Sequence, residues 1–176
     1  MKTVLMAILG IFCSSALVNE KPPLETVSKV DLSRYAGLWY EIARLPNRFQ
    51  KECLESTAEY TMLEDGKIRV VNSCREKDGK ERSVEGIAWV EDPVSNAKLS
   101  VSFVPSWLRW TGIGKGDYWI IDLSPDYQWV VVSEPKRLYL WILARNPKLD
   151  PAVFHAITKK LQERRFDLST LIIRRK

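Results

Sequence analysis

The chain has 176 residues, of which 45% are apolar and 28% are charged, so it is long enough for one domain with a core and too apolar to be disordered. Its formal net charge is +5, and the charges are interspersed except at Arg164-Arg165 and in the tail Arg174-Arg175-Lys176. No helix-turn-helix, zinc-finger or RNA-binding motif accompanies that tail, so we do not expect a nucleic-acid partner. A basic tail can favour an anionic membrane surface, but it is more often a solvated chain end.

The N-terminal segment has the pattern of a secretory signal peptide. Lys2 precedes an apolar run from Val4 to Phe12 that is too short for a typical membrane span, and the small residues Ser14-Ser15-Ala16 follow. We therefore expect an exported protein from which residues 1–16 are removed.

Cys13 allows a second interpretation of this segment, in which the chain carries a lipid. A lipoprotein signal has a small residue directly before its cysteine and an aliphatic residue three positions before it, whereas this chain has Phe12 and Gly10. We therefore favour export without a lipid, with lipidation of Cys13 as the alternative.

Residues 17–29 contain Pro22-Pro23 and predict an extended tether, followed by a single domain at residues 30–176. Asp31 is a helix-capping residue type, so we expect a short helical turn through Tyr35.

Gly37 ends a short polar entry segment, and the first strand is expected to follow it, from Leu38 through Ala43. Trp39 and Glu41 share one face of it. A large side chain at the start of a strand can fill the end of a small closed sheet, and a cation can lie on its ring. Arg145, at the end of the last strand-like run, is the candidate cation.

Seven further strands are predicted by alternation of apolar and polar residues between turn signals. They run from Ser56 to Met62, Ile68 to Asn72, Val84 to Val90, Leu99 to Phe103, Asp117 to Leu123, Gln128 to Ser133 and Leu138 to Arg145. In one of them Gly86 and Ala88 alternate with Ile87 and Trp89, and the pattern leaves open which pair faces inward.

Two segments interrupt the strand pattern. Leu45 to Lys51 is polar apart from Phe49, which either closes over a ligand or anchors the loop. Val104 to Gly116 combines Trp107 and Trp110 with three glycines. Exposed tryptophans usually meet a partner, and a lipid tail, a membrane surface and a second protomer are the alternatives here.

Cys53 and Cys74 are the two cysteines that remain after the signal segment. Folding the predicted hairpin back at Glu64 to Lys67 brings them opposite each other, so we expect a disulfide in an exported protein. A reactive thiol is the alternative. A zinc site is less expected because His155, the single histidine, lies far along the chain.

Asp150-Pro151 predicts the start of a late helix. Val153, Ile157 and Leu161 give it an apolar stripe, and charged residues occupy the other face. We expect this helix to pack on the outer wall of a sheet, with membrane binding as the alternative. Leu168 to Ile173 can return as a short edge strand.

Three motifs in this order resemble the signatures of the lipocalin family. Gly37-Leu38-Trp39-Tyr40 is similar to the first, Leu123 to Val130 with its Asp-Tyr turn to the second, and Arg145 to the third. The resemblance covers Val30 to Arg174, and the flanking residues are most similar to bacterial lipocalins of the outer-membrane lipoprotein type. It implies an all-β fold with one late helix, an eight-stranded antiparallel up-and-down β-barrel.

In such a barrel, an inward-pointing Arg145 would place Glu41 and alternate residues of the last strand inside. Gly37, Trp39 and Arg145 would then form the closed end, and Phe49, Trp107 and Trp110 would lie at the open end. The ligand-binding candidates are Tyr60, Leu99, Val101, Phe103, Trp129, Tyr139 and Trp141.

The resemblance implies a protein that holds a fatty acid or lysophospholipid, for lipid storage, transport or repair in the periplasm or at the outer membrane of a Gram-negative bacterium. The alternatives are a haem or tetrapyrrole carrier and an interaction module or homodimer that uses Trp107 and Trp110. No Ser-His-Asp order and no metal cluster is present in the sequence. We therefore expect no enzyme, no catalytic residue, no metal and no cofactor.

Overall fold

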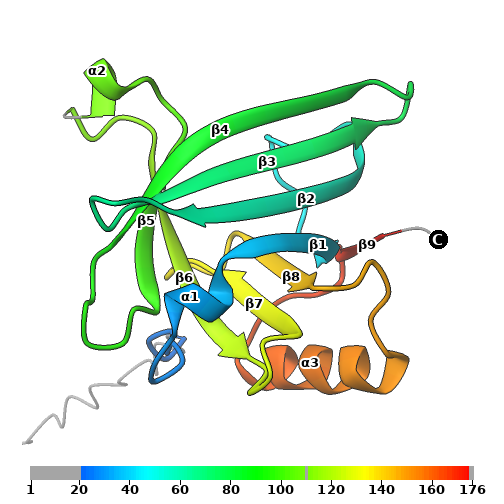
Figure 1. Cartoon of the computed structure of the whole chain (residues 1–176). Coiled ribbons are helices and arrows are strands. Elements are labelled where there is room, and N and C mark those ends of the chain that lie inside the picture. The colour runs from blue at the N-terminus through cyan, green and yellow to red at the C-terminus, as the bar shows by residue number, and fades with distance from the viewer. Residues whose placement is uncertain (1–20, 110, 175–176) are drawn as a thin grey trace, which may run out of the picture.

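The structure, a computed structural model, describes residues 21–109 and 111–174. Its strands form one antiparallel sheet in the order β2-β3-β4-β5-β6-β7-β8-β1, and β1 also pairs with β2, which closes the sheet into an eight-stranded barrel (Figure 1). Each of these eight barrel strands therefore lies beside its neighbour in the chain, the up-and-down arrangement that the sequence predicts. The signal peptide and Cys13 lie outside the described residues.

The elements have the following bounds. The strands are β1 Gly37–Arg44, β2 Cys53–Met62, β3 Ile68–Glu76, β4 Glu81–Val90, β5 Lys98–Ser102, β6 Lys115–Leu123, β7 Trp129–Ser133, β8 Leu140–Ala144 and β9 Ile172–Ile173, and the helices are α1 Leu32–Tyr35, α2 Ser106–Arg109 and α3 Pro151–Glu163.

Alternate side chains along each strand separate two apolar clusters, one inside the barrel and one on its outer wall. The inner cluster includes Trp39, Tyr60, Leu99 and Leu143. The outer cluster joins β7 and β8 to α3, where Ile157 and Leu161 are among the buried residues. Figure 1 shows α3 under β7 and β8, on the side away from β2–β4. The late helix thus packs on the outer wall, as its apolar stripe predicts.

The pairing of β4 shows which of its side chains face the barrel interior, a choice that the sequence leaves open. Ala88 belongs to the inner cluster and pairs with Val101 of β5, whereas Trp89 pairs with Ser100 on the outer side. Gly86 is therefore inside as well, and an added Cβ there would lie 2.6 Å from the Phe103 ring. The small residues make room for that ring.

Asp31 caps α1, accepting hydrogen bonds from the backbone N–H groups of Ser33 and Arg34, and Asp150 caps α3 in the same way. Cys53 and Cys74 form a disulfide, as the hairpin register predicts. It ties the start of β2 to the end of β3.

The segment before α1 is extended, but it does not hang free as a tether over the part that the structure describes. Leu24 is buried in the outer cluster. The Val27 N–H donates to the Ile120 carbonyl and the Val30 N–H to the Ser95 carbonyl. These contacts hold the segment along the closed end of the barrel.

The return strand β9 is shorter than expected. It pairs with Ala43 and Arg44 of β1, where β2 has separated from β1. Among the described residues, no helix has the length and apolar character to cross a membrane.

Candidate functional site

One end of the barrel is closed by α1, Trp39 and Arg145. Trp39 is fully buried. The guanidinium carbon of Arg145 lies 3.8 Å from the centre of its ring, within the range of a cation–π contact. Gly37, which starts β1, has φ +94° and lies against the Arg145 side chain, a backbone conformation that favours glycine. This end of the barrel is packed shut.

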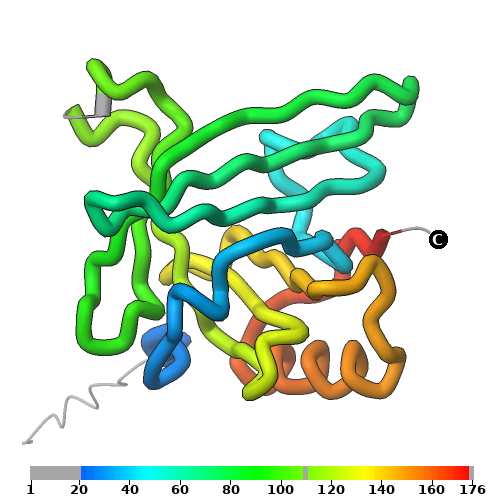
Figure 2. The backbone as a smooth tube through the Cα atoms, viewed as in Figure 1, coloured from blue at the N-terminus to red at the C-terminus, as the bar shows by residue number. Residues whose placement is uncertain are grey.

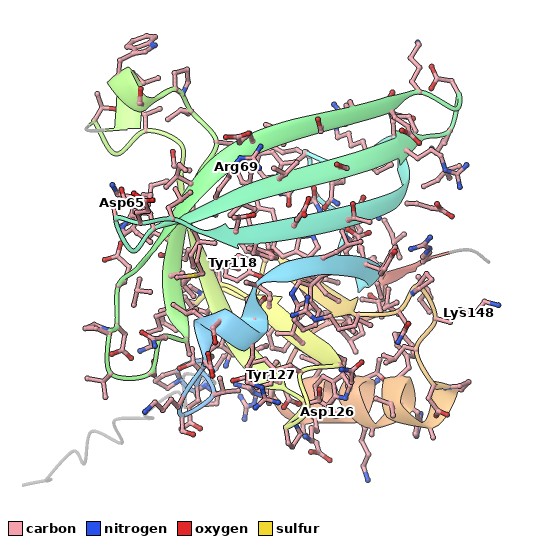
Figure 3. The ribbon with its side chains drawn as sticks, viewed as in Figure 1. Asp65, Arg69, Tyr118, Asp126, Tyr127 and Lys148 are labelled. Carbon is pink, nitrogen blue, oxygen red and sulfur yellow. A yellow bond between two sulfur atoms is a disulfide. The ribbon has the colours of Figure 1, made fainter. Side chains whose placement is uncertain are left out.

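Directly inside this end lies a tyrosine triad, formed by Tyr35 of α1, Tyr60 of β2 and Tyr118 of β6. The Tyr118 hydroxyl is 2.5 Å from the Tyr35 hydroxyl and 2.9 Å from the Tyr60 hydroxyl. Figure 3 places the Tyr118 label between the β2–β4 ribbons and α1. Three elements far apart in the sequence therefore bring three hydroxyl groups to one point.

Burial controls the ionisation of the triad. It raises the pKa of Tyr60 to about 12 and raises the pKa values of Tyr35 and Tyr118 well above the ordinary value, because a phenolate would lose its hydration there. The three side chains are neutral phenols at physiological pH, and they act as hydrogen-bond donors and acceptors without charge.

The wall between the triad and the open end is apolar. Leu99 is buried, while Val101 and Phe103 of the same inner face are only partly buried. Trp141 of β8 faces them and is partly buried too. A barrel that binds an apolar ligand requires inner-facing side chains with accessible surface, and these residues have it.

A polar cluster, which we call the mouth network, crosses the barrel near its open end. It consists of Glu41, Arg44, Gln50, Ser56 and Trp141. Glu41 and Arg44 are both buried and form an ion pair. A register shift between Glu41 and Ala43 in β1 turns Arg44 to the inside, opposite Trp141.

Gln50 is the centre of the mouth network, although it belongs to the loop after β1. Its Nε2 donates to Glu41 Oε2 at 2.7 Å and to Ser56 Oγ at 3.0 Å. Its Oε1 accepts from Trp141 Nε1 and from Asn47 Nδ2, both at 2.9 Å. All four hydrogen-bonding positions of one carboxamide are thus used.

The loop that carries Gln50 is also fixed to the far side of the barrel. Figure 2 shows this loop, in cyan, passing close to the strands β2–β4. Arg82 donates to the Phe49 carbonyl and the Lys77 N–H to the Glu52 carbonyl. The loop therefore lies across the open end.

The aromatic residues of the open end have different surroundings. Phe49 is 58% exposed, with its ring centre 6.1 Å from that of Tyr139, which in turn stacks on Trp141 at 6.0 Å. Phe49 thus contacts the rim and remains largely in solvent. Trp107 lies on α2 and is 71% exposed, and Trp110 lies outside the described residues.

The prediction that Trp129 lines the interior is wrong. Val130 and Val132 of β7 belong to the inner cluster, so Trp129 points outward and packs in the outer cluster, with Lys160 Nζ of α3 6.0 Å from its ring centre. Alternation does not indicate which side chains of β7 face inward, because α3 covers the outer wall and both faces of this strand are apolar. The other six candidates lie on the inner face or at its rim, as do Glu41 and Leu143.

The tyrosine triad and the mouth network were largely missed by sequence reasoning. Tyr35 looked like the end of a capped turn, Gln50 like a polar loop residue, and Tyr118 was only part of a strand. The signal that could have found Tyr118 is its spacing of two residues from Ile120, which puts both side chains on one face of the strand.

The remaining polar features of residues 21–109 and 111–174 do not form a second interior site. His155 is exposed on α3, outside the barrel. In the part of the chain that the structure describes, no three His, Cys, Asp or Glu side chains come together as metal ligands would. A groove of about 420 Å³ lies along β2–β4 beside Tyr40 and Arg174, and most of its lining residues are polar or charged, among them Glu55 and Arg75.

A closed antiparallel barrel with an apolar inner face defines a class of proteins that bind small apolar ligands. Comparison with known proteins agrees with this class. Residues 30–176 match the family model described as the lipocalin-like domain. The chain is 40% identical over 157 residues to temperature-induced lipocalin-1 of Arabidopsis thaliana, covering 88% of this chain and 83% of that one.

The bacterial resemblance is confirmed too. The chain is 33% identical over 171 residues to the outer membrane lipoprotein Blc of Vibrio cholerae, covering 94% of this chain and 96% of the relative. Among solved structures, insecticyanin from the tobacco hornworm Manduca sexta has a similar fold, with a TM-score of 0.67, 22% identity, and coverage of 89% of this chain and 86% of that one. The chain belongs to the lipocalin family and is a small-ligand binder.

Proposed function

We propose that this lipocalin holds a fatty acid or lysophospholipid with its acyl chain along the apolar inner wall. The observation that carries the proposal is the continuous inner cluster, closed at one end by Trp39 and Arg145 and partly accessible at Val101, Phe103 and Trp141. Removing apolar surface from water is worth about 25 cal/mol per Å², so an acyl chain needs no further chemistry to bind there.

The polar part of such a lipid would lie at the open end. Arg48 and Lys51 are in the loop that crosses it, and the mouth network supplies polar atoms just inside. Because Glu41 neutralises Arg44, the mouth network itself carries no net charge. A headgroup therefore finds hydrogen-bonding partners and outer cations there, and the acyl chain finds the wall below.

We infer export to the periplasm or outer membrane from the signal-like N-terminus and from the bacterial relative named an outer membrane lipoprotein. A plant protein and a mimivirus protein with the name putative lipocalin are relatives as well. Sequence similarity alone therefore supports membership of the family more strongly than it supports a location in the bacterial envelope. Trp107 would serve contact with a membrane or a second protomer in this proposal.

The test is mass spectrometry of the mature protein purified from its native source, under native and denaturing conditions. We expect an acyl lipid that co-purifies and is lost on denaturation, and a delipidated protein whose tryptophan fluorescence changes when fatty acid or lysophospholipid is added. A protein that carries nothing and refuses both lipids in titration would overturn the proposal. The same spectra give the N-terminus, so a lipidated start at Cys13 would overturn export without a lipid.

A further inference from the structure

The tyrosine triad holds one hydroxyl proton more than its own hydrogen bonds use. Three phenols carry three protons, and the triad contains two hydrogen bonds. Within the described residues these hydroxyl groups have no other hydrogen-bond partner. Tyr35 and Tyr60 are 3% and 6% exposed, and a buried donor without an acceptor is costly.

The unused proton can lie on any member of the triad, because either oxygen of each hydrogen bond can be the donor. Tyr118 is the central member and the only one that is partly buried rather than buried. If Tyr35 and Tyr60 both donate to the two lone pairs of Tyr118, the unused proton is on the Tyr118 hydroxyl. That arrangement places the unused donor on the one member of the triad that keeps some accessible surface as a residue.

The surroundings of the triad favour an uncharged acceptor. Burial is the largest cause of the raised pKa of all three tyrosines. A charged ligand group placed at the triad would lose its hydration in the same way, which disfavours it there. The nearby cation, Arg145, donates to the carbonyl groups of Arg34, Ala36 and Leu38. It also donates to the backbone carbonyl of Tyr35, so it is held by the backbone and does not hydrogen-bond to the hydroxyl groups of the triad.

The inner wall between the triad and the open end is apolar, and its side chains are small next to Tyr118. Gly116 and Val101 are paired on the inner face just beyond Tyr118, and a Cβ added at Gly116 would only reach ordinary contact, 3.8 Å from Val101. The mouth network lies at the open-end side of this wall. The interior therefore has a polar group at each end and apolar walls between them.

We propose that the Tyr118 hydroxyl is a binding site for an uncharged oxygen, a hydroxyl or ketone, at the buried end of a long apolar ligand. The charged group of that ligand stays at the open end. The inference deepens the proposed function, because it names the kind of lipid that fits best: one oxygenated at the end remote from its headgroup.

The test compares ω-hydroxy fatty acids of increasing chain length with the unsubstituted acids. Dissociation constants are measured on delipidated protein by tryptophan fluorescence, for wild type, Tyr118→Phe and Tyr60→Phe. Tyr60→Phe is the matched control, because Tyr35 can still donate to Tyr118 and leave the Tyr118 proton for the ligand. Tyr139→Phe controls for loss of a phenol hydroxyl at the rim.

At the chain length that reaches the triad, the preference for the ω-hydroxy acid should fall about three- to tenfold in Tyr118→Phe, the range expected for one hydrogen bond. Because Tyr60 and Tyr139 are themselves candidate lining residues, only this ratio, and not the absolute dissociation constants, should be retained in both controls. An equal preference in wild type and Tyr118→Phe at every length would overturn the inference. So would weaker binding of the unsubstituted acid in Tyr118→Phe with tighter binding at low pH, since the carboxyl end would then be at the triad.

A long-chain ketone and the hydrocarbon of equal length separate this inference from the proposed function. If no acid binds but the ketone does and depends on Tyr118, the fatty-acid proposal fails and this one stands. In wild type alone, the infrared C=O stretch of the bound ketone should lie below its frequency in hydrocarbon solvent. An unshifted stretch, or no binding of the ketone, would contradict the inference without any variant.

Discussion

Arg145 and Trp39 hold the closed end of the barrel together, with the guanidinium carbon of one 3.8 Å from the ring centre of the other. Arg145 also donates to four backbone carbonyl groups, those of residues 34, 35, 36 and 38. Trp39 Nε1 donates to the Tyr35 carbonyl at 2.8 Å. The pair therefore satisfies the end of α1 and fastens it to β1 at the same time.

Replacing Arg145 by lysine should destabilise the protein by about 2–3 kcal/mol, because an ammonium group cannot reproduce the planar fork or its stacking on the indole. Urea unfolding measures this. Arg69→Lys is the control, since its ion pair with Glu85 is exposed and should change stability by less than about 1 kcal/mol. Equal effects of the two substitutions would show that the closed end does not depend on the guanidinium.

Gly86→Ala should disturb the barrel interior where Gly116→Ala does not. The new Cβ at residue 86 would be 2.6 Å from Phe103 Cδ1 and 2.7 Å from the Ser102 carbonyl oxygen. Because a backbone atom cannot move aside cheaply, we expect a loss of about 1–3 kcal/mol, as for an overpacked core. At Gly116 the nearest atom is 3.8 Å away.

Thermal unfolding of the two glycine variants, with a crystal structure of the first, is the measurement. We expect the Phe103 ring to turn further into the interior in Gly86→Ala and to weaken binding of an acyl ligand. A Gly86→Ala protein as stable as Gly116→Ala would mean that the two strands separate more easily than the packing indicates.

Gln50→Leu should release the loop after β1 from the barrel. The substitution leaves Glu41, Ser56 and Trp141 without the partner that the carboxamide provides, and unpaired buried polar groups cost about 1–3 kcal/mol each. Hydrogen exchange of residues 45–52 should become faster. Lys51→Ala, in the same loop but exposed, should leave the exchange unchanged, and unchanged exchange in Gln50→Leu would show that other contacts hold the loop.

Alkaline pH should destabilise the protein through the tyrosine triad. The pKa of Tyr60 is raised from 10.0 to about 12, so the folded state keeps a proton that the unfolded state loses. Its contribution to the free energy of unfolding is complete below pH 10 and is lost as the pH rises from about 10 to 12. Urea unfolding across this window should show a weaker pH dependence in Tyr60→Phe than in wild type, and identical slopes would contradict the assignment.

Local sequence determined much of the architecture. Alternation along the strands, the caps Asp31 and Asp150, and the turn between Cys53 and Cys74 each act over a few residues, and the structure has the elements that they predict. Trp39 and Arg145 were identified as partners because a barrel end needs one large side chain and a cation can lie on it.

Tertiary structure decided what strand alternation left ambiguous. In β7 both faces are apolar, since α3 covers the outer wall, and only the closed sheet turns Trp129 outward and Val130 inward. In β4 the choice of Gly86 over Trp89 for the interior depends on Phe103, the residue directly after β5. Alternation along a strand indicates which side chains face inward only when one face of the strand is polar.

The tyrosine triad and the mouth network also depend on the closed barrel. Tyr35 and Tyr118 are separated by 83 residues and Gln50 and Trp141 by 91, and the shift in β1 that turns Arg44 inward involves a single residue. The local sequence determined that this chain forms strands with one apolar face. Barrel closure decided which polar groups meet inside it, because hydrogen bonds between distant residues form only once the sheet has brought them within reach.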